Sequence, residues 1–142
     1  MKLSTKSTYG LRAMVNIALG NEKGAVSVKE ISAKENISDV YLEQLLNKLR
    51  REALVKSVRG PLGGYILSKD PGMITVRDIV LTLEGNISPV DCASGRESWK
   101  TVCGKSKNCV SRIVWTKLAK SMSDCLDSIT LKDLCEEARR LK

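Results

Sequence analysis

The chain has 142 residues, and its 24 Lys and Arg against 16 Asp and Glu give it a formal net charge of +8. It is long enough for one compact domain with an appendage but not for two full-sized domains, and without a run of about 18 apolar residues it should not span a membrane. The basic balance fits either a well-solvated surface or a polyanionic partner, because Lys and Arg displace counterions from a phosphate backbone.

A first helix is predicted near the start of the chain, where apolar residues recur at helical spacing: Ala13, Met14, Ile17 and Ala18. We expect Gly20 to end this helix at the C′ position, where glycine often adopts a left-handed conformation. Residues 1–6 lack the apolar run of a signal peptide, so a cytoplasmic location is expected.

The next two predicted helices form a helix-turn-helix. Residues 27–30 match a capping box that begins a short helix, and residues 35–37 make the turn after it. Ser38 can cap a third helix, whose leucines recur at helical spacing at positions 42, 45, 46 and 49. Two helices joined by a short turn, with a polar outer face on the second, are typical of proteins that read DNA.

A β-hairpin is predicted directly after the third helix. Residues 54–58 and 65–67 read as short strands, with the sequence RGPLGG between them at positions 59–64. Its glycines permit a tight turn with positive φ. In isolation such a loop is only a turn, but after a helix-turn-helix it is typical of a wing. Arg59 at its base can enter a narrow minor groove or clamp a phosphate.

Three more helices are predicted in the second half of the chain. The first and the last of them begin with capping boxes, and the one between them is long. Residues 75–78 cap a helix that Gly85 ends, and residues 130–133 cap the last one. Residues 86–107 lose periodicity, which in so long a segment favours a functional or ligand-ordered loop. From about Cys109 a broad apolar face returns, and a second copy of the chain is its natural partner.

We therefore expect a mainly α, winged helix-turn-helix fold with a small β-hairpin. The expected parts are a winged helix-turn-helix DNA-binding domain (1–85), a cysteine-containing cluster loop (86–108), and a dimerisation helix with a C-terminal helix (109–142).

Three of the five cysteines, Cys92, Cys103 and Cys109, lie in or beside this loop. In a reducing cytosol they are expected to be ligands or sensors rather than disulfides. Thiolates are the usual ligands of iron–sulfur clusters. Their spacing of ten and five intervening residues matches neither ferredoxins nor zinc fingers. A thiol–disulfide switch and a zinc ion held by three thiolates therefore stay open. Cys125 and Cys135 fall on apolar stripes and are expected to pack in the core.

Four segments resemble the IscR-type winged-helix regulators of the Rrf2 family: residues 2–14 (KLSTKSTYGLRAM), 41–46 (YLEQLL), 58–65 (VRGPLGGY) and 129–134 (ITLKDL). The resemblance covers essentially the whole chain. It implies a bacterial homodimeric repressor or activator, not an enzyme, that binds a double-stranded DNA operator. The positions that it implies for DNA contact are Ser38, Tyr41, Glu43, Gln44, Arg59 and Gly60. Glu43 and Gln44 have the chemistry to read C and A base edges respectively.

The resemblance also implies an iron–sulfur cluster, with 2Fe-2S favoured over 4Fe-4S, because three loop cysteines hold one in this family. Cys92, Cys103 and Cys109 occupy those places. Cluster-biogenesis regulators of this type carry a His three residues after the third cysteine, where this chain has Arg112, which stays protonated and cannot be a ligand. Three candidates for the fourth ligand stay open: Asp91, a side chain of a partner subunit, and a small exogenous thiol.

The expected function is thus a regulator whose operator binding is modulated by the cluster and which governs iron–sulfur cluster biogenesis. One alternative is a cluster-free or thiol-switch regulator, controlled by a partner protein as the cysteine-metabolism regulators are. Another is a nitric-oxide-sensing cluster repressor, since some such relatives carry three cysteines without the His. Neither a small-molecule substrate nor a membrane partner is expected. The chain has no His, which removes the commonest general base of enzymes.

Overall fold

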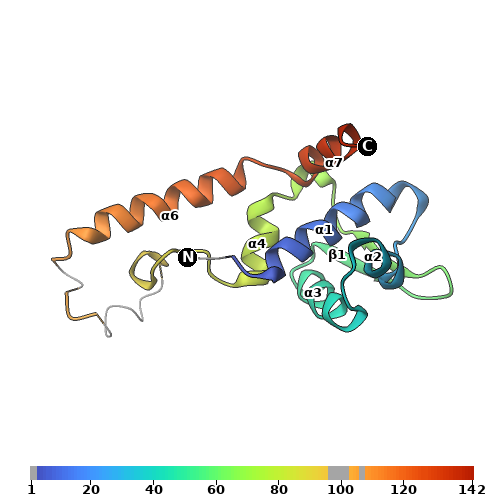
Figure 1. The fold of residues 1–142 in the computed structure, drawn as a ribbon, viewed down its shortest axis with the longest axis horizontal. Helices are drawn as coiled ribbons and strands as arrows, with labels where there is room; N and C mark the ends of the chain where they lie inside the picture. The colour runs from blue at the N-terminus through green and yellow to red at the C-terminus, as the bar shows by residue number, and fades with distance from the viewer. Residues whose placement is uncertain (1–2, 96–102, 106–107) are drawn as a thin grey trace.

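The computed structural model describes residues 3–95, 103–105 and 108–142. Its elements are α1 (Thr5–Gly20), η1 (Asn21–Lys23), α2 (Val28–Glu35), α3 (Asp39–Arg51), β1 (Val55–Val58), β2 (Gly64–Leu67), η2 (Pro71–Met73), α4 (Val76–Glu84), η3 (Asp91–Ala93), α6 (Ser111–Asp127) and α7 (Leu131–Arg140). Most helices gather into one body, while α6 extends away from it as an arm (Figure 1). In the described part of the chain, none of the helices has the length and apolar character needed to cross a membrane.

The helix-turn-helix is formed by α2 and α3. The Ser27 hydroxyl accepts the Glu30 N–H at 3.1 Å and so caps α2. Asn36 then ends α2 in the left-handed conformation, with φ 54°, which Asn tolerates better than most residues. The Ser38 hydroxyl accepts the Tyr41 N–H at 3.2 Å and begins α3. The leucines of α3 at positions 42, 45, 46 and 49 are all buried, which confirms the predicted inner face.

The wing is an antiparallel hairpin of β1 and β2, in which Val55 pairs with Leu67 and Val58 with Gly64. A further pairing was not predicted: Val26 and Tyr65 exchange both backbone hydrogen bonds at 2.9 Å. Gly64 makes this approach feasible, since a Cβ there would collide with the Val26 carbonyl and its φ is +151°. The wing is therefore anchored to the segment before α2 and does not hang free.

Two full capping boxes start α4 and α7. Thr75 and Asp78 exchange hydrogen bonds of 3.0 and 3.1 Å, and Thr130 and Asp133 exchange bonds of 2.8 and 3.2 Å. The two starts also pair with each other: the Leu131 N–H donates to the Ile74 carbonyl at 2.8 Å. The helix α7 thereby returns to the body and packs against α1, so that α6 alone forms the arm.

Two sequence-based expectations in these helices are wrong. Gly20 does not end α1 in a left-handed conformation; it is the last residue of the helix, with φ −84°. Glycine is needed at position 20 because a Cβ there would collide with the Val26 side chain. Cys135 is buried in the core, as expected, but Cys125 is exposed. The cause is that no residue of α6 is buried in the single chain.

The ends of α1 and α4 are held together by one carboxylate. Glu84 Oε1 accepts the Ser4 N–H at 3.0 Å and the hydroxyls of Ser4 and Ser7 at 2.6 Å each. Burial raises the pKa of Glu84, but the hydrogen bonds from both serines outweigh it, and the pKa lies below its ordinary value. This contact joins residues 77 and 80 positions apart in the sequence and fixes the last residue of α4, just ahead of the predicted cluster loop, against the start of α1.

We expect Glu84→Gln to lower the free energy of unfolding at neutral pH by about 1 kcal/mol, because hydrogen bonds to an ionised acceptor are the stronger ones. A depressed folded-state pKa stabilises the protein above the unfolded-state pKa, and this contribution is lost as pH falls through the folded-state pKa. The gap between wild type and variant in urea unfolding should therefore close toward acidic pH. A gap that stays constant with pH would contradict this role of the charge.

Candidate functional site

A shallow, open hollow of about 440 Å³ lies between the outer face of α3 and the wing. Its walls are seven residues, five from α3 and two from the hairpin: Val40, Glu43, Gln44, Asn47, Arg50, Ser57 and Tyr65. The helical members recur every three or four residues and so share one face. Glu43 and Gln44, both predicted as DNA contacts, are exposed there. The hollow therefore joins the predicted recognition helix to the predicted wing.

Ser38 and Tyr41 stand at the start of α3. The Ser38 side chain is exposed, and its oxygen is used as the helix cap. The Tyr41 hydroxyl lies 3.0 Å from the Thr5 hydroxyl, and its ring meets Tyr9 edge-on, with centroids 6.0 Å apart. Tyr41 thus braces α3 against α1 in the free protein. A contact of either residue with DNA stays a prediction.

The tip of the wing carries Arg59 and Gly60, and both are exposed. Gly60 has φ +111°, which favours glycine, and its carbonyl accepts the Gly63 N–H at 3.0 Å to close the turn. Further exposed cations lie on β1 and at the end of α3: Lys48, Arg50, Arg51 and Lys56. Of these cations Arg50 lines the hollow itself, and the others add positive charge to the same two elements, which favours a polyanionic partner.

The three loop cysteines are all among the described residues, although much of the predicted cluster loop is not. Cys92 is half-buried in η3, Cys103 is exposed, and half-buried Cys109 stands two residues before α6. In residues 3–95, 103–105 and 108–142, no three Cys, Asp or Glu side chains come together as metal ligands would. Most of the chain between Cys92 and Cys109 lies outside the described residues. The ligand set therefore stays a prediction.

Cys109 lies beside groups that favour its thiolate form. The Ser111 hydroxyl lies 3.1 Å from its sulfur and lowers the pKa of the thiol, and the Arg112 N–H and the charge of Lys105 lower it further. The thiolate is the form that binds metals and reacts with oxidants. Cys135 is the opposite case, because burial raises the pKa of its thiol. The two cysteines therefore differ: Cys109 lies beside groups that favour its thiolate, whereas Cys135 is a buried thiol that packs in the core.

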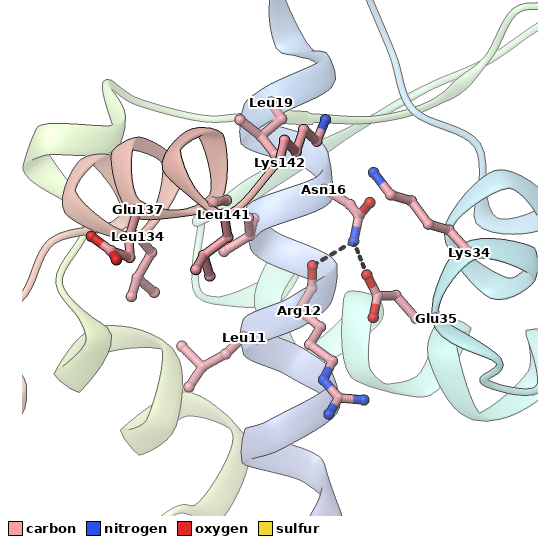
Figure 2. A pocket seen from close by; sticks show the side chains of 12 residues that line it. Leu11, Arg12, Asn16, Leu19, Lys34, Glu35, Leu134, Glu137, Leu141 and Lys142 are labelled. Carbon is pink, nitrogen blue, oxygen red and sulfur yellow. Dashed lines mark hydrogen bonds between the residues drawn. The ribbon is translucent and has the colours of Figure 1, made fainter.

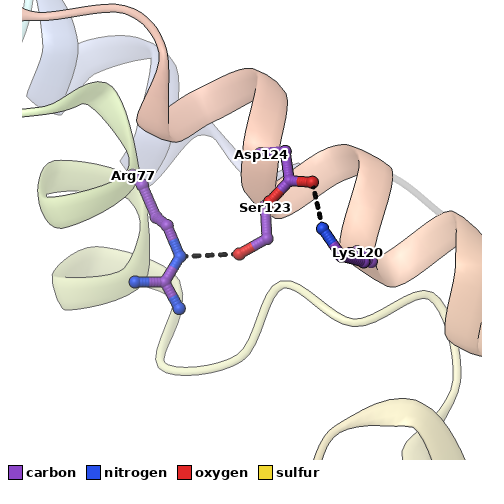
Figure 3. Close-up of polar contacts among 4 residues, drawn as sticks. All are labelled: Arg77, Lys120, Ser123 and Asp124. Atoms are coloured by element: carbon purple, nitrogen blue, oxygen red, sulfur yellow. Dashed lines mark hydrogen bonds and ion pairs between the residues drawn. The ribbon is translucent and has the colours of Figure 1, made fainter.

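The arm α6 meets the body at α4. Arg77 Nε donates to the Ser123 hydroxyl at 2.7 Å, and beside this contact Lys120 pairs with Asp124 at 2.6 Å (Figure 3). A polar cleft of about 420 Å³ lies there, between α4, the start of the cluster loop and α6. The first half of α6 and the residue before it carry an uncovered apolar surface: Val110, Ile113, Val114 and Trp115.

A second cavity, of about 440 Å³, lies between α1 and α7 and has mainly apolar walls (Figure 2). Leu11 and Leu19 of α1 face Leu134 and Leu141 across it. On one rim the Asn16 amide donates to the Arg12 carbonyl at 2.8 Å and to Glu35 at 2.7 Å. No sequence pattern indicated this cavity, because it depends on α7 docking onto α1 from far along the chain.

The chain is similar in sequence and structure to known transcriptional regulators. Residues 3–137 match the sequence profile of the Rrf2 family, described as an iron-dependent transcriptional regulator. The HTH-type transcriptional regulator CymR of Bacillus subtilis (strain 168) is 42% identical over 134 residues, which are 94% of this chain and 89% of CymR.

Solved structures agree with the sequence comparison. That of CymR, described as the global cysteine regulator of B. subtilis, has a TM-score of 0.77 at 40% identity and covers 96% of this chain and 98% of its own. That of T. potens IscR has a TM-score of 0.79 at 39% identity and covers 100% of this chain and 91% of its own. These proteins are transcriptional regulators and not enzymes.

Proposed function

The chain belongs to the Rrf2 family of transcriptional regulators, and we propose that it is a homodimer whose binding to a DNA operator is modulated by an iron–sulfur cluster. The cluster would be held by Cys92, Cys103 and Cys109, and the regulated process would be cluster biogenesis. The observation that carries this proposal is the position of Cys109, which lies two residues before α6 with the Ser111 hydroxyl 3.1 Å from its sulfur. The iron-dependent description of the family and the likeness to IscR support it.

The hollow beside α3 is the proposed reading surface. A helix of this diameter fits the major groove of B-DNA, and hydrogen-bonding side chains on its outer face can meet base edges there. Glu43 and Gln44 would make such contacts, with Ser38 and Tyr41 at the helix start. Arg59 and Gly60 on the wing would reach the neighbouring groove, where a guanidinium fits a narrow, negative channel.

We expect Arg59→Ala to weaken binding to a cognate operator by about 1–3 kcal/mol, or about 5- to 150-fold, if the guanidinium contacts a base. The side chain is exposed, so the fold should not change. The matched control is Arg140→Ala, which removes an exposed arginine of α7. Fluorescence anisotropy with operator and with random DNA measures both affinities. Unchanged operator binding would exclude the wing from recognition, and an equal loss on both DNAs would restrict Arg59 to phosphate contact.

The dimer is proposed to form through α6. The exposed side chains of Ile113 and Val114, at 58% and 56%, need a partner surface that the single chain does not provide. A twofold pair of arms would present two recognition helices about one DNA turn apart, roughly 34 Å, as operator half-sites require.

The donor set fits an iron–sulfur cluster. Three thiols flank or occupy one loop, and the Ser111 hydroxyl, the Arg112 N–H and Lys105 favour the thiolate of Cys109, which is the ligand form. Arg112 cannot complete the set, so the fourth ligand remains to be found. A bound cluster supplies a centre whose assembly depends on iron and sulfide and whose redox state can change.

The helix α4 gives the loop a route to the DNA-binding surface. Its last residue, Glu84, holds Ser4 and Ser7 at the start of α1, and its first turn holds α6 through Arg77 and Ser123. The cluster loop follows α4 directly. Binding of a cluster by the loop would therefore act on both α1 and α6, and such coupling typically amounts to about 1–3 kcal/mol.

A second candidate is a cluster-free or thiol-switch regulator of cysteine metabolism. It is supported by the 42% identity to CymR and by that protein's description as a global cysteine regulator. The lowered pKa of Cys109 also suits a redox-sensitive thiol.

Purification without oxygen distinguishes the two candidates. The visible absorption spectrum and the iron and acid-labile sulfide content are then measured on the full-length protein. The proposed function predicts a coloured protein with iron and sulfide in equal amounts. A protein that stays colourless and free of iron, even after reconstitution with iron and sulfide, would exclude the cluster-dependent function and favour the regulator of cysteine metabolism. If a nitric oxide donor bleaches the coloured protein, the cluster reacts with nitric oxide, as the nitric-oxide-sensing alternative requires.

A further inference from the structure

The recognition face of α3 contains one apolar side chain among polar ones. Val40, the second residue of the helix, is 69% exposed and lines the hollow beside Glu43, Gln44 and Asn47. These four residues follow the spacing of one helical face. Val40 therefore contributes little to the core, and its position in the hollow suggests a role in binding.

A lone exposed valine is ordinary on most protein surfaces, but two features set this one apart. It lies in the first turn of the helix, and the N-terminal residues of a recognition helix are those that approach base edges. Its neighbours are hydrogen-bonding side chains on the same wall of the hollow, and Arg50 further along donates to Asn47 at 2.7 Å. An apolar group in such a row matches an apolar feature on the surface that the helix meets.

Unmodified DNA offers one such partner in the major groove. Each base pair shows hydrogen-bond donors and acceptors there, and only thymine adds a methyl group, at C5. We propose that Val40 contacts the C5 methyl group of a thymine in each operator half-site and so selects thymine at that position. This inference rests on the proposed DNA-binding function and names a feature of its target.

The test begins with an operator selected from random duplexes by the purified full-length protein. Each thymine of both half-sites is then replaced in turn by deoxyuridine, which lacks only the C5 methyl group. At one position in each half-site we expect about a fourfold loss of affinity, the value for burial of one methyl-sized group of about 0.8 kcal/mol. The other thymines should change affinity less than twofold.

Two variants of Val40 connect this effect to the residue. Val40→Ser and Val40→Asn both remove the two γ-methyl groups and place a polar group in their position. Both should fold normally, since the side chain is exposed. In both, the penalty for deoxyuridine at the sensitive position should fall below twofold. Met73→Ala, which truncates a 70%-exposed residue of η2, is the control and should keep the full penalty.

The outcomes separate this inference from the function on which it rests. If no duplex is selected over random DNA, the proposed function itself fails. If an operator is selected but no thymine methyl matters, the inference about Val40 is wrong while the regulator stands. A methyl effect that persists unchanged in both polar variants of Val40 would assign the contact to another residue and would equally overturn the inference.

Discussion

Replacing any one of Cys92, Cys103 and Cys109 by alanine should remove the bound iron and sulfide completely. With a single thiolate gone, at most two of the three cysteine ligands remain, and a cluster is rarely retained by so few. The measurement is the iron and sulfide content of each variant after purification without oxygen. Operator affinity should change similarly in all three variants, because each produces the same cluster-free protein.

The matched controls are the two cysteines of the C-terminal helices. Cys125 is exposed on α6, and Cys125→Ala should leave iron, sulfide and stability unchanged. Cys135 is buried, so Cys135→Ala should retain the cluster and lose about 1 kcal/mol of stability through the small cavity that it leaves. A loop variant with full iron and sulfide, or a cluster that requires Cys125 or Cys135, would refute the ligand assignment.

A charge on the apolar face of the arm should give the second large effect. In a dimer paired through α6, Ile113→Asp would bury a carboxylate without a partner, which costs several kcal/mol. We expect monomers at micromolar concentration in sedimentation velocity and a loss of operator affinity of at least about a hundredfold, since two half-sites can no longer be bound together.

Met73→Asp is the control for this substitution, because it places the same charge at an exposed apolar residue of the body. It should leave both the dimer and the operator affinity unchanged. The dimer proposal would be wrong if the wild type sedimented as a monomer, or if Ile113→Asp stayed dimeric and bound the operator normally.

Local features of this protein were predictable from sequence because their signals are local. The leucine spacing of α3 indicated its buried face, and the glycines between β1 and β2 indicated the turn. The capping boxes at Thr75 and Thr130 formed as expected, since their two partners are only three residues apart. The winged helix-turn-helix is an assembly of such local signals in a fixed order, and for this reason the amino-acid pattern was enough to predict it.

Contacts between distant segments could not be predicted in the same way. Glu84 meets Ser4 and Ser7 only because α1 and α4 pack together, and nothing in the local pattern of either helix indicates this. Gly20 has the sequence context of a helix end, yet its small size serves a contact with Val26. Cys125 lies on an apolar stripe but is exposed, because the stripe of an arm has no core beneath it.

The proposed function requires that the cluster change the affinity of the protein for its operator. The most direct test is the dissociation constant for one selected operator, measured on a single preparation before and after removal of its iron and sulfide, at constant salt. We expect the dissociation constant to change about 5- to 150-fold, which corresponds to a coupling of about 1–3 kcal/mol. Equal affinities of the two forms, with the cluster shown to be present in one and absent from the other, would contradict it.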